Sequence, residues 1–170
     1  MDNSFFAYIQ ELELIAFFSG FPLIYVLILL VSESSKLNRD FKNRLTHLLP
    51  FGYALAGTLY LGLILRNLHP VYSLENIQNP YLTCWGILAV LFWIPALSKK
   101  SIFSLLHSLI ILSVLVINQL TQLVSKSPDI NMIRNNMKIY TISLCLNLGT
   151  FTCLLLFSFV LNYFRKRTIS

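Results

Sequence analysis

Residues 81–124 read YLTCWGILAVLFWIPAL, then SKKS, then IFSLLHSLIILSVLVINQLTQLV, so two apolar runs are separated by only four polar residues. A membrane-spanning helix needs about 17–25 predominantly apolar residues, and each run is about that long. A connection as short as Ser98 to Ser101 forces the two helices to be antiparallel neighbours. The stretch therefore predicts a membrane hairpin, and the rest of the chain can be interpreted outward from it.

The composition extends this interpretation to the whole chain. Of its 170 residues, 56% are hydrophobic and 12% are charged, whereas soluble domains average roughly 25% charged residues. In lipid only helices and closed barrels satisfy their backbone hydrogen bonds, and these runs are too long for barrel strands. We expect an all-α, polytopic integral membrane bundle forming a single transmembrane domain, residues 1–170. About five transmembrane helices are expected, at about 14–32, 48–65, 81–97, 102–124 and 139–164.

Two of these spans carry features that concern helix geometry. In the first span, Pro22 follows Ser19 and Gly20, and a proline removes a backbone donor from the helix. The freed carbonyl near Phe18 needs another partner in lipid, so we expect either a kinked helix or a broken helix that lines a polar site.

In the second span, small residues recur every four positions, a spacing that favours close helix packing. These residues are Ala54, Thr58 and Gly62.

Polar side chains form stripes on the last two spans. At helical spacing, such a stripe is expected to face protein or water and to avoid lipid. Two interpretations follow: the stripes line a water-filled path between copies of the chain, or they hold helices together. The candidate pore-lining residues are Ser104, Ser108, Leu115, Asn118 and Gln122 on the fourth span, and Ser143, Asn147 and Thr150 on the fifth.

Basic residues predict the orientation. The net charge is +6, and with the N-terminus outside, nine of the 13 Lys and Arg residues fall on the inner side, which the positive-inside rule favours. We therefore expect a bacterial inner (plasma) membrane protein with its N-terminus outside and its C-terminus in the cytoplasm. The inner basic residues are candidates for binding an anionic ligand or lipid headgroups. They are Lys36, Arg39, Lys42, Arg44, Lys99, Lys100, Arg165, Lys166 and Arg167.

Catalytic chemistry is missing from the predicted spans. The middle of the membrane contains no Asp, Glu, Lys or Arg, so His107 is the one candidate for proton-coupled chemistry, and we interpret it as a packing or interfacial residue. Cys84, Cys145 and Cys153 lie inside apolar runs without a CxxC motif, so we interpret them as small apolar residues. We expect no enzyme, no metal site and no cofactor.

Three functions remain compatible with the sequence. The first is a homo-oligomeric ion channel or pore-type membrane effector, gated by dewetting of an apolar constriction and possessing a cytoplasmic basic surface for an anionic ligand. The second is a non-conducting structural or assembly subunit of a membrane complex. A small-molecule transporter using the break at Pro22 ranks third. The expected partners are the lipid bilayer, further copies of the chain, and an anionic ligand or protein in the cytoplasm, whereas nothing indicates nucleic acid.

Overall fold

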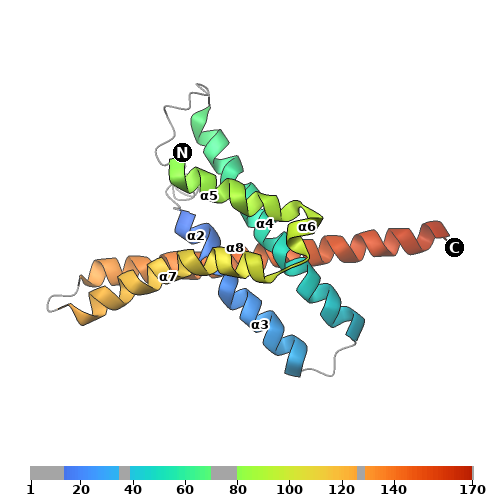
Figure 1. The fold of residues 1–170 in the computed structure, drawn as a ribbon, viewed down its shortest axis with the longest axis horizontal. Helices are drawn as coiled ribbons and strands as arrows, with labels where there is room; N and C mark the ends of the chain where they lie inside the picture. The colour runs from blue at the N-terminus through green and yellow to red at the C-terminus, as the bar shows by residue number, and fades with distance from the viewer. Residues whose placement is uncertain (1–13, 35–38, 70–79, 126–128, 170) are drawn as a thin grey trace, which may run out of the picture.

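The computed structural model describes residues 14–34, 39–69, 80–125 and 129–169 (Figure 1). Within these ranges every regular element is a helix, which confirms the all-α prediction. Four helical segments are long and apolar enough to cross a membrane, where about five were expected. They are Ala16–Glu33, Arg39–Arg66, Ile102–Val124 and Asn136–Phe164. The helices are α2 (Leu14–Phe18), α3 (Phe21–Ser34), α4 (Arg39–Leu68), α5 (Pro80–Val90), α6 (Pro95–Ser98), α7 (Ile102–Val124) and α8 (Ile130–Ile169), with the 3-10 helix η2 at Leu91–Trp93.

The segment expected at 81–97 is the one that falls short of a continuous span. The α-helix α5 ends at Val90 and is followed by the 3-10 helix η2. Helical structure ends before Ile94, whose backbone is extended at φ −72° and ψ 122°. Pro95 explains the stop, because a proline disfavours the helical conformation of the residue before it. Pro95 then begins the short helix α6. The apolar helix Thr83–Trp93 is therefore shorter than the four long segments.

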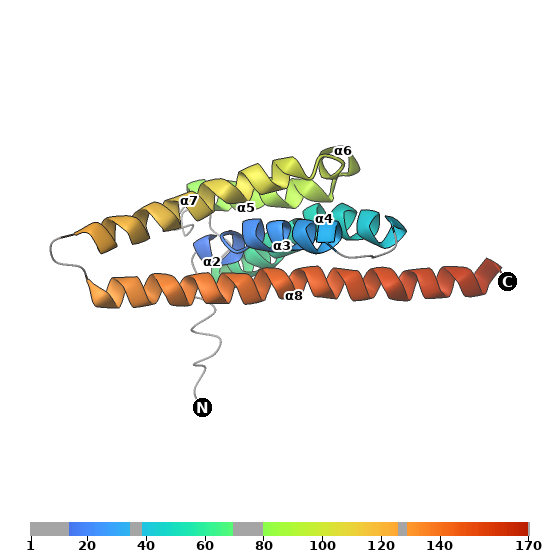
Figure 2. The ribbon, with the colours of Figure 1, turned by 90° about the horizontal axis from the view of Figure 1, so that it is seen from below.

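The helices form three layers. Figure 2 shows α8 on one side, α2, α3 and α4 in the middle, and α5, α6 and α7 on the other side. In Figure 1, α4 crosses α8, while α7 runs antiparallel to α8. The starts of α4 and α7 and the end of α8 all lie toward the same side of the molecule (Figures 1 and 2).

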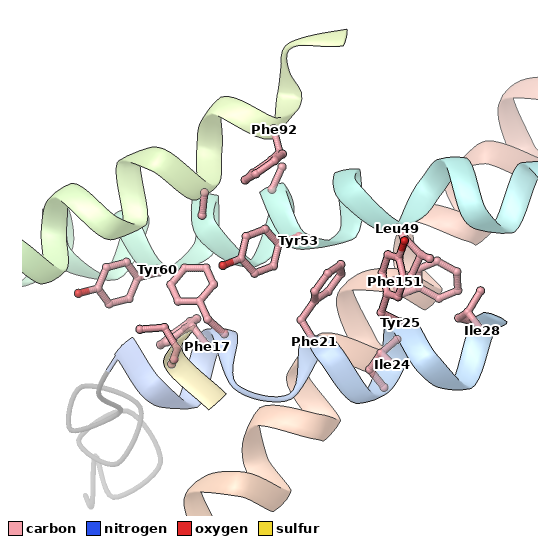
Figure 3. Packing of buried hydrophobic residues seen from close by; sticks show 14 of the residues in the cluster. Phe17, Phe21, Ile24, Tyr25, Ile28, Leu49, Tyr53, Tyr60, Phe92 and Phe151 are labelled. Atoms are coloured by element: carbon pink, nitrogen blue, oxygen red, sulfur yellow. The ribbon is translucent and has the colours of Figure 1, made fainter. Parts of the chain in front are cut away.

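Aromatic side chains fill the centre of the bundle (Figure 3). Tyr53 of α4 is fully buried, and its ring contacts Phe18, Phe21 and Phe92 at centroid distances of 5.2, 4.7 and 5.7 Å. Edge-on and tilted pairs of this kind contribute roughly 0.5–1.5 kcal/mol each beyond the burial of their area. The broken first span, α4 and η2 are thus joined around one tyrosine.

The two last helices expose most of their apolar surface. Only 22% of the membrane-length window of α7 and 17% of that of α8 are buried, compared with 56% for the first span and 44% for α4. Contiguous apolar surface on this scale marks contact with a membrane or with another protein. By composition and length, these helices are compatible with a membrane location.

Candidate functional site

The first span is broken at Ser19 and Gly20, between α2 and α3. Pro22 accounts for the break, because it has no N–H to donate to the carbonyl of Phe18 four residues earlier. Gly20 lets this backbone lie directly against α8: a Cβ at Gly20 would stand 2.6 Å from the carbonyl carbon and oxygen of Ser143. Of the two expected geometries, the structure shows the broken helix.

Polar side chains of α8 bind the exposed backbone of the break. The hydroxyl of Ser143 accepts a hydrogen bond from the Gly20 N–H at 2.7 Å. The amide nitrogen of Asn147 donates to the carbonyl of Phe17 at 2.9 Å and to the carbonyl of Ser143 at 2.8 Å. Thr150, also buried, donates to the carbonyl of Asn147 at 2.9 Å. The stripe predicted on the fifth span therefore exists, and within this chain it faces the broken helix.

The stripe predicted on the fourth span divides into two parts. Ser104, Ser108 and Leu115 are buried inside the bundle, and the two serine hydroxyls donate to carbonyls of Ser101 and Leu105 at 2.7 and 2.9 Å. Asn118 is exposed and Gln122 is half-buried. Six of the eight pore-lining candidates are consequently covered by this chain's own helices, and the structure does not bring all eight to one open surface.

A second polar cluster surrounds His107 of α7. Its Nδ1 lies 2.6 Å from the hydroxyl of Tyr53, and its ring stacks on Trp85 at a centroid distance of 4.2 Å. The indole nitrogen of Trp85 and the Nε2 of His107 are buried and have no hydrogen-bond partner among the described residues. The histidine joins α4, α5 and α7 through an aromatic cage, and this cage has no carboxylate to complete an acid–base pair. Sequence reasoning missed it, since its members lie on three separate spans.

The basic candidates take two different positions. Arg44 is bound to α8: its guanidinium donates to the hydroxyl of Ser158, with 2.9 Å between Nε and Oγ. Arg39, Lys99, Lys100 and Arg167 are exposed, and Lys42 is half-buried. They belong to the start of α4, the α6–α7 turn and the end of α8, which lie toward one side (Figure 2). Lys36 and the side chains of Arg165 and Lys166 lie outside the described residues.

The three residues of the small-residue face predicted on α4 lie in different surroundings. Ala54 is fully buried, and Thr58 donates to the Ala54 carbonyl while accepting from the indole nitrogen of Trp93, both at 2.9 Å. Among the described residues, a Cβ added at Gly62 would meet no atom within 4 Å outside the backbone of its own helix. The close approach occurs instead at Gly57, where a Cβ would stand 2.9 Å from the Cβ of Ala89 on α5. Ala54 is thus packed within this chain, whereas the described part of the chain leaves Gly62 open.

The described chain defines an all-α protein with four helices of membrane-spanning length and polar contacts inside the bundle. Among the residues that the structure covers, no group of three or more His, Cys, Asp or Glu side chains is placed to hold a metal ion. Comparisons with protein-family models, curated proteins and solved structures find no match to this chain.

Proposed function

We propose that this chain is a non-conducting helical subunit of a membrane assembly. The observation that carries the proposal is the burial of the polar stripes: Ser143 and Asn147 are 0% and 2% exposed and bind the backbone of the broken first span. A water-filled path between copies requires such side chains on a shared open surface. Here they act as polar contacts between helices of one chain, a common role of Ser and Asn in membranes.

The outer face of α7 is where we place the partner helix. Asn118 is exposed there, next to the large apolar side chains Val114 and Ile117, which are 52% and 62% exposed. Its amide makes no hydrogen bond with any described residue. An amide in apolar surroundings is costly until it is hydrogen-bonded, and a helix from another protein or copy can supply that bond.

A photo-crosslinking amino acid at position 118 in native membranes tests this placement. Leu156 of α8, which is 59% exposed, provides the matched control on the other outward-facing helix. We expect one discrete protein adduct from position 118 and only lipid adducts from position 156. Equal, diffuse adducts at both positions would contradict the proposal, since α7 would then face lipid as α8 does.

The homo-oligomeric channel expected from the sequence is the competing function. It requires α7 and α8 to separate from α2 and α3 so that the buried serines and Asn147 meet water. Of the eight pore-lining candidates, only Asn118 and Gln122 have side chains that are exposed or half-buried in the described structure. Both lie near one end of α7. Ion flux distinguishes the two functions, as described in the Discussion.

We further propose that the N-terminus lies outside and the C-terminus lies in the cytoplasm of a bacterial inner (plasma) membrane. The gathering of basic residues from three segments toward one side of the molecule supports this orientation (Figure 2). The test is Lys100→Cys in a background where Cys84, Cys145 and Cys153, all exposed, are replaced by serine. An impermeant thiol reagent should label it in inverted vesicles only, and labelling of intact cells would reverse the orientation.

A further inference from the structure

The break between α2 and α3 leaves buried oxygen atoms without hydrogen-bond donors. Ser19 is 0% exposed and Asn147 is 2% exposed. The Oγ of Ser19 and the Oδ1 of Asn147 have no hydrogen-bond partner among the described residues. Buried polar atoms are almost always paired, so two such atoms at one break indicate a missing partner.

The orientation of the Asn147 amide makes its free atom an oxygen. Its nitrogen donates to two carbonyl oxygens, of Phe17 and Ser143, at 2.9 and 2.8 Å. Carbonyl oxygens only accept hydrogen bonds, so exchanging the amide nitrogen and oxygen would place three acceptors together. Oδ1 is therefore the atom without a partner, and it belongs to a side chain that already contacts the break.

The backbone of the break adds a further oxygen. In a continuous helix the carbonyl of Phe18 would accept from the N–H of residue 22, but residue 22 is proline. Residues 16–32 and 139–164 contain no charged side chain. Phe18, Ser19 and Asn147 thus offer three neutral oxygens, two from the break and one from the α8 side chain that binds it.

We propose that this break binds a monovalent cation of the size of Na⁺ through Ser19 Oγ, Asn147 Oδ1 and the carbonyl oxygen of Phe18. Oxygen atoms freed by an unwound membrane helix are suited to coordinate Na⁺. Divalent ions such as Ca²⁺ and Mg²⁺ normally require carboxylates, and none lies in these segments. The bound ion ties the break to α8 and supplies the partner that the three oxygens lack. This inference goes beyond the proposed assembly role and does not depend on it.

Thermal unfolding of the purified full chain in detergent tests the site. NaCl is titrated against N-methyl-D-glucamine chloride at constant ionic strength, so that only the cation changes. A ligand that binds only the folded state raises the melting temperature progressively as its concentration increases. We expect Na⁺ to raise it, and Ser19→Ala to shift the half-effective Na⁺ concentration upward at least tenfold. Ser113→Ala is the matched control, because that exposed hydroxyl donates to its own helix at Ile110.

Two outcomes would overturn the proposal. A wild-type melting temperature that is the same in both salts would show that no Na⁺ binds the folded protein at these concentrations. An equal Na⁺ response in wild type and Ser19→Ala would place the effect elsewhere. Should Ser19→Ala fail to fold, the ²³Na resonance of wild-type samples gives an independent answer: protein should broaden it beyond detergent alone, and excess Na⁺ should saturate the effect. An unchanged linewidth would also refute the site.

Discussion

The guanidinium of Arg44 on α4 binds the hydroxyl of Ser158 on α8, with 2.9 Å between Nε and Oγ. A second guanidinium nitrogen also donates to this hydroxyl, at 2.6 Å, and to the carbonyl of the same residue. The guanidinium carbon lies 4.6 Å from the ring centre of Phe159. Arg44 thereby joins the polar start of α4 to the last third of α8.

Ser158→Ala should lower the free energy of unfolding by about 1.5–3 kcal/mol, because hydrogen bonds to a charged group fall in that range. The measurement is reversible chemical unfolding in mixed micelles. Thr152→Ala on the same helix is the control, since its hydroxyl is exposed and donates to its own helix at Leu148. Equal effects of the two substitutions would mean that Arg44 does not stabilise the α4–α8 contact.

Gly57 and Gly62 provide a matched pair on α4. Gly57→Ala should destabilise the protein by about 1–3 kcal/mol, because the added Cβ meets Ala89 at 2.9 Å and the α5 backbone at 3.3 Å. Gly62→Ala should be neutral or stabilising by up to about 1 kcal/mol, since it removes a helix-interior glycine in open space. Thermal unfolding of both variants checks the order. A larger loss of stability for Gly62→Ala than for Gly57→Ala would show that Gly62 is the more closely packed glycine of α4.

Two buried tyrosines of α4 test the contact with His107. Tyr53→Phe keeps the ring contacts but removes the hydroxyl that lies 2.6 Å from Nδ1, so we expect a loss of about 1–3 kcal/mol. Tyr60, whose hydroxyl has no hydrogen-bond partner among the described residues, should tolerate the same change with a loss below about 1 kcal/mol. Unfolding free energies of the two variants give the comparison. Similar values would show that the hydroxyl of Tyr53 does not stabilise the fold through His107.

Features that depend on the residues of a single helix were predicted correctly from the sequence. The span expected at 102–124 coincides with α7, and the stripe of Ser143, Asn147 and Thr150 is buried as one face, because both depend on local hydropathy and helical spacing. An interruption of the first span near Pro22, either a kink or a break, was expected because proline acts within its own helix.

Contacts between helices were not predictable from the sequence, because they depend on where a second helix lies. The break and the α8 stripe were each visible in the sequence, but nothing local reveals that Ser143 accepts from Gly20, 123 residues earlier. The spacing of small residues did not single out Gly57, because its close approach to Ala89 depends on the position of α5. The interruption at Ile94 was not expected, since residues 81–97 were predicted to form one span.

We propose that the polar stripes hold one chain together and do not line a path across the membrane. Leu115 is 7% exposed beside the α7 stripe, so a gated path along this stripe would have Leu115 in its apolar barrier. Leu115→Ser would make such a barrier easier to wet, whereas in a packed interior it only removes apolar contacts.

The most direct measurement is ion flux from liposomes containing equal amounts of folded wild type or Leu115→Ser, each with a parallel thermal unfolding curve. Candidate anionic ligands are added on the face that carries the exposed basic residues. We expect both proteins to remain as silent as empty liposomes and Leu115→Ser to unfold at a lower temperature. Flux through wild type, or flux that appears in Leu115→Ser with its stability unchanged, would contradict the account.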